Sequence, residues 1–166
     1  MATSEPRSDQ YWLKSVGAAD WEMESDWFDR TPNETERIRF SDKTPASIRV
    51  DDPLLYYAAS HMKLFGIVTV FTKPKRDGVE KRWPWSARVR PKVIIRSLDR
   101  APSLDILSDV DDAKDWHKFV QQMDYQGIDE NVFEHAAQAL INVADPARGD
   151  ILDADFASTY QESRRT

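Results

Sequence analysis

The stretch KRWPWSARVR, Lys81 to Arg90, combines two kinds of side chain that suit contact with a nucleic acid. Arginine and lysine neutralise phosphates, and the flat faces of tryptophan rings stack on unpaired bases. Trp83 and Trp85 flank Pro84, and residues two apart on an extended chain share a side. We therefore expect both indoles to face the same way, with one lining a site and the other flanking its mouth.

The positive charge of the chain is concentrated around this stretch. The whole sequence has a net charge of −6, but residues 73–102 carry 10 basic and 3 acidic side chains, a net +7. Residues 1–72 stand at −4 and residues 103–166 at −9. A local basic stripe is the footprint of a polyanion partner, which acidic flanks would repel elsewhere. A solvated, charged strand face is the alternative interpretation.

Catalytic and metal-binding patterns are mostly missing from the sequence. It has no cysteine and only three histidines, which excludes disulfides, thiolate catalysis and Cys-based zinc sites. His61, in YYAASHM, is the histidine nearest a plausible site, but a lone histidine is more often a packing residue. The pairs Asp51-Asp52 and Asp111-Asp112 fit a turn and a helix start. We expect no metal, no cofactor and no cleavage centre.

The six tryptophans divide into core and loop positions. Trp116 has the spacing of a helix core, and Trp12 belongs to the core of a first strand. Tyr11 then faces the opposite side of that strand and is expected to be free to line a site. The remaining four fall in loops: Trp21, Trp27, Trp83 and Trp85. Loop tryptophans either cover a barrel end or stack on an unpaired base, and two loops beside a basic stripe favour stacking.

The elements that would position these residues are strands followed by helices, an α+β arrangement. Apolar alternation predicts strands at 11–14, 36–41, 54–57, 65–72 and 87–95, with Pro91 at an edge or a bulge. Helical spacing predicts amphipathic helices within 109–123 and 129–144. We expect a disordered segment 1–9, one domain over 10–145 and a loosely packed tail over 146–166. No apolar run is long enough for a membrane span or secretory signal, so a cytoplasmic protein is expected, and a DNA-binding one would be nucleoid-associated.

The order of these motifs resembles the EVE domain, a PUA-like fold related to YTH domains. YWLKS resembles the EVE opening, DDPLLYYAASHMKLFGIVTV resembles the next two strands, and RWPWSARVRPKVIIRSLDRAPSLDIL resembles the later tryptophan strand. SDWFDRTPNE is similar to a YTH stretch that carries a cage tryptophan. The chain departs from the family at Val16-Gly17, where an acidic residue and proline are typical, and in the segment that ends at His61.

This resemblance implies a mixed β-barrel, surrounded by helices, with a pocket for a modified base: a modified cytosine of DNA in EVE domains and N6-methyladenosine of RNA in YTH domains. It implies a non-enzymatic reader that flips 5-methylcytosine or a related modified cytosine out of double-stranded DNA into an aromatic cage, with restriction of modified DNA beside a partner nuclease as its role. The expected pocket residues are Tyr11, Ser15, Trp21, Trp27, Asn33, Tyr57, Ser60, His61, Trp83 and Trp85. The expected phosphate contacts are Arg30, Lys73, Lys75, Arg76, Lys81, Arg82 and Arg88.

Three alternatives stay open at this point. The same fold could read modified RNA. A PUA-like enzyme could act on a small molecule through His61 or a lysine. A protein-interaction domain would use the tryptophans only as core.

Overall fold

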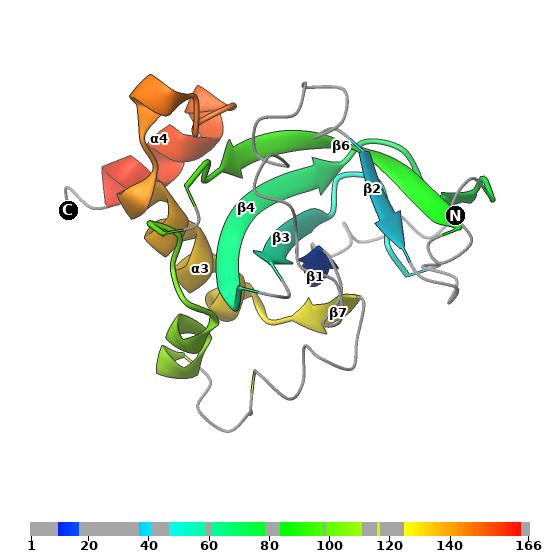
Figure 1. The fold of residues 1–166 in the computed structure, drawn as a ribbon, viewed down its shortest axis with the longest axis horizontal. Helices are drawn as coiled ribbons and strands as arrows, with labels where there is room; N and C mark the ends of the chain where they lie inside the picture. The colour runs from blue at the N-terminus through cyan, green and yellow to red at the C-terminus, as the bar shows by residue number, and fades with distance from the viewer. Residues whose placement is uncertain are drawn as a thin grey trace, which may run out of the picture.

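The computed structural model describes residues 10–16, 37–40, 47–58, 61–78, 84–97, 99–110, 116 and 125–163. Their seven strands form one curled sheet in the order β2-β6-β4-β3-β1-β7, with β5 paired beside β6 (Figure 1). The strands are β1 (Tyr11–Val16), β2 (Arg37–Phe40), β3 (Pro53–Ala58), β4 (Lys63–Val70), β5 (Lys75–Arg76), β6 (Trp85–Ile94) and β7 (Tyr125–Ile128). The helices are η2 (Leu104–Asp109), α3 (Glu130–Val143), η3 (Pro146–Arg148) and α4 (Ala154–Ser163).

The sheet is mixed, because β1 and β3 run parallel while the other neighbours run antiparallel. The expected α+β class with a mixed, barrel-like sheet is confirmed, and each strand expected from the sequence is present with small differences at its ends. The pairing of β4 with β6 changes register between Ile67 and Val68, where Val68 faces Pro91. The bulge expected at this proline is therefore confirmed, since a proline cannot donate to a regular ladder.

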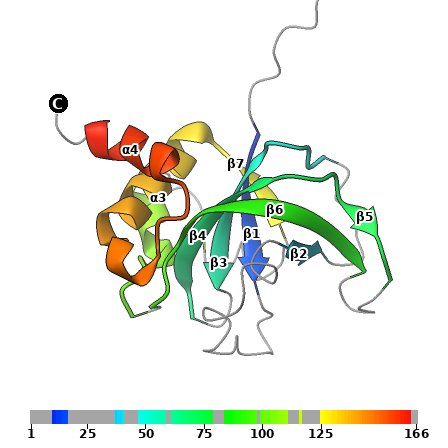
Figure 2. The same cartoon turned by 90° about the horizontal axis from the view of Figure 1, so that it is seen from above.

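The sheet curls until its two edge strands meet. The ring of Phe40 at the end of β2 lies 5.6 Å from the ring of Tyr125 at the start of β7, edge to face. Figure 2 shows the same curl from above, with β6 arching over β1 and β3. Both views place β2 and β5 at the end of the sheet that lies away from α3 and α4. The curl gives the sheet an inner and an outer face.

Register assigns side chains to these two faces, because residues directly opposite on antiparallel strands point the same way. Ile38 pairs with Ala87, and Phe40 with Trp85, on the inner face, where Ile38, Phe40 and Ala87 are buried. Arg37 pairs with Arg88 on the outer face, where both are exposed. The β2–β6 part of the sheet therefore buries apolar side chains inside and presents cations outside.

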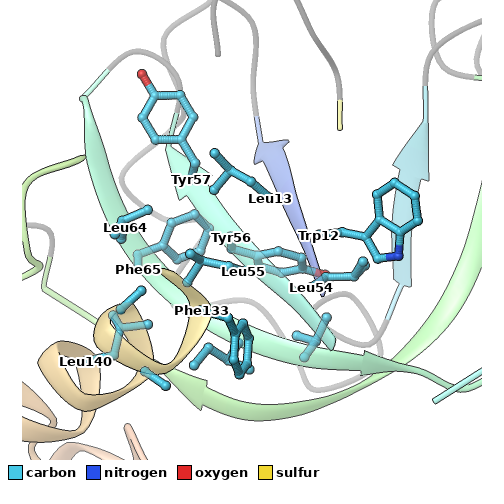
Figure 3. Packing of buried hydrophobic residues seen from close by; sticks show 14 of the residues in the cluster. Trp12, Leu13, Leu54, Leu55, Tyr56, Tyr57, Leu64, Phe65, Phe133 and Leu140 are labelled. Atoms are coloured by element: carbon cyan, nitrogen blue, oxygen red, sulfur yellow. The ribbon is translucent and has the colours of Figure 1, made fainter. Parts of the chain in front are cut away.

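Helices cover the other part of the outer face. Phe133 and Leu140 of α3 point toward the sheet beside Leu55 and Phe65 (Figure 3). The helix confirmed here is the second of the two predicted from apolar spacing. Of the first, predicted within 109–123, the structure describes Asp109 and Val110, which end η2, and Trp116, which is 2% exposed as its core spacing predicts.

Two elements differ from the sequence-based expectation. The segment 146–166 was expected to be a loosely packed tail, yet it contains α4, whose Ala157 and Tyr160 are buried against the core. Asp153 begins this helix by accepting from the backbone N–H of Phe156 at 3.0 Å, and it pairs with Lys92 of β6 at 2.7 Å. β7 was not expected at all. It forms because β1 supplies an antiparallel partner from the far end of the chain.

Candidate nucleic-acid interface

The ends of the parallel strands β1 and β3 bring three of the expected site residues together. Ser15 and Tyr57 occupy paired positions of the two strands. The turn after β3 returns at once to β4, with the backbone N–H groups of His61 and Met62 both donating to the Ala58 carbonyl at 3.1 and 3.0 Å. Met62 has a positive φ of 57°, which this tight turn requires. His61 is therefore held within the same end of the sheet as Ser15 and Tyr57.

Tyr57 is available at neutral pH as a hydroxyl donor. Burial raises the pKa of its phenol to about 12, so the side chain remains protonated throughout the physiological range. Its hydroxyl points away from the other labelled core residues in Figure 3 and donates to the sulfur of Met62 at 2.7 Å. The group can change partner when a ligand with an oxygen or nitrogen acceptor arrives, because a thioether is a weak acceptor.

His61 has a buried polar atom that finds no hydrogen-bond partner within the described ranges. This atom is Nε2, and among the described residues the imidazole makes no contact with an acidic side chain or a hydroxyl that would activate it. Leaving such a group unpaired in a folded protein costs about 1–3 kcal/mol. The imidazole is thus suited to accept or donate one hydrogen bond to a ligand.

Trp85 lies on the inner face at the first position of β6, packed against the core. Its indole Nε1 is buried and, like the Nε2 of His61, has no hydrogen-bond partner in the part of the chain that the structure describes. Its cross-strand neighbour Phe40 is fully buried and contacts the ammonium of Lys14, whose Nζ lies 5.3 Å from the ring centroid. Lys14 precedes Ser15 on β1 and donates to the Ser15 carbonyl. A chain of contacts thus joins Trp85 to the end of β1.

Phe40 and Lys14 were missed by the sequence-based reasoning. The alternation in RIRF does place Phe40 on the inward side of a strand, which was a usable signal. Nothing in the sequence indicated that a lysine in the first strand would be 2% exposed and lie over that ring. The barrel closure, which joins β2 to β1 and β7, creates this arrangement.

Tyr11 points to the side of β1 that was expected, but this side is covered and not open to a ligand. It does face away from Trp12 along β1, but its ring packs on Phe133 of α3 at a centroid distance of 4.8 Å. The side chain is thus part of the sheet–helix packing and is not free to line a site. Trp12, in contrast, is in the core as expected, and its Nε1 donates to the buried carboxylate of Asp52 at 3.0 Å.

The expected phosphate contacts that the structure describes are all exposed: Lys73, Lys75, Arg76 and Arg88. Lys75 and Arg76 form the short strand β5, paired with Ser86 and Trp85 at the start of β6. Asp77 follows β5 and connects it to β6 and β2, since its carboxylate accepts a hydrogen bond from Ser86 at 2.8 Å and pairs with Arg39 at 3.1 Å. Cations and the indole of Trp85 therefore share one end of the sheet.

Several expected site residues lie outside the described residues: Trp21, Trp27, Arg30, Asn33, Ser60, Lys81, Arg82 and Trp83. Their roles remain predictions. Among the residues that the structure does describe, no three histidine or acidic side chains gather as a metal site would require. No helix within those same ranges is long and apolar enough to cross a membrane.

Comparison with known proteins supports the fold. No protein-family model and no curated protein matches the sequence. Solved structures do match: protein Atu2648 from Agrobacterium tumefaciens has 14% identity and a TM-score of 0.54, covering 78% of this chain and 92% of that one. Rpa0253 from Rhodopseudomonas palustris has 9% identity and a TM-score of 0.54, covering 79% and 92%.

A third match carries a ligand. It is human THYN1 in complex with DNA that contains 5-methylcytosine, with 12% identity and a TM-score of 0.50, covering 76% of this chain and 94% of THYN1. At these identities the likeness extends to the fold, and the PUA-like fold expected from the sequence is confirmed at that level.

Proposed function

We propose that this protein is a non-enzymatic reader of modified DNA, which binds 5-methylcytosine or a related modified cytosine after flipping it out of the duplex. The observation that carries the proposal is Trp85, an indole on the inner face whose buried Nε1 has no hydrogen-bond partner among the described residues, next to the exposed cations of β5. The shared fold of THYN1, solved with 5-methylcytosine DNA, supports the same ligand class.

The energetics of this proposal are favourable with two stacking walls. Extruding a base from a duplex costs a few kcal/mol, and each aromatic stacking face returns about 1–3 kcal/mol. Trp85 or Trp83 supplies one wall in the proposal, and Trp27 supplies the other. The unpaired Nε2 of His61 and the neutral hydroxyl of Tyr57 then serve the hydrogen-bonding edge of the base. Ser15, Asn33 and Ser60 complete that edge, with Trp21 beside it.

The backbone of the DNA is held by cations in this proposal. Lys73, Lys75, Arg76 and Arg88 are exposed around β5 and β6. Arg30, Lys81 and Arg82 join them as proposed phosphate contacts. The proposal assigns no bond-breaking step to the chain, so a role in restriction of modified DNA would need a partner nuclease.

Fluorescence titration with two DNA duplexes that differ only by one cytosine methyl group tests the proposal. We expect tighter binding of the methylated duplex, by about fourfold if burial of the methyl group alone discriminates. Replacing the indole in Trp85→Ala should weaken binding of the methylated duplex by about tenfold or more, because a stacking face is removed. Trp85→Phe keeps a ring without the N–H, so its affinity for the methylated duplex should lie between those of the wild type and Trp85→Ala.

Two results would overturn the assignment. Equal binding of both duplexes would contradict a reader of modified DNA, and tighter binding of a matched methylated RNA would assign the site to RNA. Turnover of a small molecule by the wild type that disappears in His61→Ala, with DNA binding unchanged, would instead identify an enzyme.

A further inference from the structure

The outer face of β2 and β6 carries an arrangement of charge that the fold itself does not explain. Arg37 and Arg88 lie directly opposite each other on neighbouring strands, and both are exposed. Arg90 is exposed two residues further along β6, on the same face as Arg88. Like charges placed directly opposite destabilise a sheet. Within the part of the chain that the structure describes, none of the three forms an ion pair with an acidic side chain.

Arg39 provides an internal comparison on the same face. It lies two residues from Arg37 on β2 and pairs with Asp77 at 3.1 Å. The sheet therefore neutralises this arginine and leaves the charges of its neighbours open to an external anion.

Phe71 orders two of these open arginines. Its ring is 40% exposed just after β4, with the guanidinium carbon of Arg90 4.2 Å and that of Arg88 5.6 Å from the ring centroid. The backbone N–H groups of Phe71 and Thr72 both donate to the Arg88 carbonyl, at 2.8 and 3.2 Å, so the ring and the arginine are held together through their backbones as well. A cation–π contact holds the guanidinium while leaving its N–H groups open, which reduces the entropic cost of binding.

We propose that Arg37, Phe71, Arg88 and Arg90, here called the arginine face, bind the phosphodiester backbone of the DNA outside the base-binding site. This inference rests on the proposed function, because it takes DNA as the ligand. The arginine face lies on the reverse of the inner surface that carries Trp85, since residues alternate along β6. Lys75, paired with Ser86, extends it toward β5.

The chemistry of the arginine face favours phosphates. All three cations are arginines, whose planar N–H groups match phosphate oxygens in pairs. Arg88 and Arg90 are about 6.8 Å apart along an extended strand. Phosphates of one DNA strand follow one another at about 3.4 Å of rise along the helix axis, so two guanidinium groups this far apart can each contact a separate phosphate.

The triple substitution Arg37→Gln, Arg88→Gln and Arg90→Gln tests the inference on full-length protein. We expect the affinities for the methylated and unmodified duplexes to fall by the same factor. The slope of log affinity against log salt between about 50 and 200 mM should become shallower by about 0.9 for each phosphate that is no longer neutralised, or about 2.7 for three. The melting temperature should not fall, since repulsion between like charges is removed.

Two variants complete the design. Phe71→Leu should weaken binding of both duplexes with an unchanged salt slope, because it removes the ordering ring and no charge. Arg148→Gln is the matched control: Arg148 is exposed, lies in η3 next to Asp145, and its replacement should leave affinity and slope unchanged.

An unchanged salt slope in the triple variant would overturn the inference. The inference would also fail if the triple variant no longer bound a polyglutamate peptide but bound DNA as tightly as the wild type. That result would assign the arginine face to an acidic protein. Failure of the proposed function gives a different result from failure of this inference. The wild type would then bind both duplexes equally, while the triple variant would still have a shallower salt slope on both.

Discussion

Individual tryptophans show how far residue type alone predicts position. Trp12 was expected in the core, and the Asp51-Asp52 pair was expected to form a turn. The structure joins the two, because Asp52, 4% exposed, accepts from the Trp12 indole at 3.0 Å and from the backbone N–H of Arg49 at 2.9 Å. The carboxylate therefore fixes the turn before β3 to the first strand and has a structural role.

Removal of this carboxylate should lower stability. We expect Asp52→Ala to reduce the free energy of unfolding by about 2 kcal/mol, since it leaves two buried or half-buried donors unpaired. Urea unfolding measures the difference. In a Trp12→Phe background, which lacks the indole donor, the same substitution should cost less. Equal reductions in both backgrounds would show that the hydrogen bond from Trp12 contributes nothing.

Tyr11 marks the limit of such reasoning at single residues. Strand alternation correctly placed it opposite Trp12, yet which element covers that side depends on α3, which begins more than 100 residues later. A local pattern gives the direction of a side chain and cannot give its distant neighbour. The same limit applies to Lys14, which is buried only because the curled sheet brings Phe40 over it.

At the scale of elements, strands with clear apolar alternation were predictable, including the four-residue β2, and elements without such a pattern were not. β4 and β6 are eight and ten residues long and rich in β-branched residues, so their pattern is unambiguous. β7 has four residues, YQGI, and its glycine weakens any strand signal. α4 has a mixed polar sequence, ADFASTYQES, and forms where Ala157 and Tyr160 find the core. Contacts with distant parts of the chain therefore determine that β7 and α4 form.

Gly66 controls how closely three strands approach. A Cβ added there would lie 2.8 Å from Ile94 Cδ1 and 3.1 Å from the Val93 carbonyl oxygen, with Tyr56 next to it. We expect Gly66→Ala to destabilise the protein by about 1–3 kcal/mol through overpacking. Gly127→Ala is the matched control on β7, because its Cβ would meet only Trp12 at an ordinary 3.9 Å. Similar melting temperatures of the two variants would contradict the expectation.

Across the whole molecule, charge is divided between the two ends of the sheet. The described residues 125–163 on the helical side carry 8 acidic side chains and one arginine, whereas the exposed cations gather at β2, β5 and β6. The basic stripe was predictable from the sequence because it is continuous along the chain. Its division into inner aromatic and outer cationic faces was not, since that depends on the pairing of β2 with β6.

The Lys92–Asp153 ion pair joins β6 to the start of α4 and should make stability depend on pH. The hydrogen bond from Lys92 holds the pKa of Asp153 below its ordinary value of 3.8. A carboxyl whose native pKa is depressed stabilises the fold above its unfolded pKa, and this contribution disappears as the pH falls through the native value. We expect Asp153→Asn, which keeps a capping side chain, to cost about 1 kcal/mol or less at pH 7.

Urea unfolding of wild type and Asp153→Asn at a series of pH values checks this. The difference should begin to shrink below about pH 4, where the carboxyl of the unfolded chain gains its proton, and should be gone below the lowered native pKa of Asp153. A difference that stays constant into acid would contradict a contribution from the ion pair. Asp153→Ala removes the cap as well and should cost about 1 kcal/mol more at every pH.

The position of β1 between β3 and β7 also bears on how the protein is made. One edge of β1 can pair with β3 early, but its other edge waits for residues 125–128, about 110 residues later. At a synthesis rate of about 5–20 residues per second, that edge stays unpaired on the ribosome for about 5–20 s. An open, largely apolar strand edge is a template for intermolecular pairing. Nascent chains that stop before β7 are therefore expected to aggregate, because β1 keeps one unpaired edge until residues 125–128 have been made.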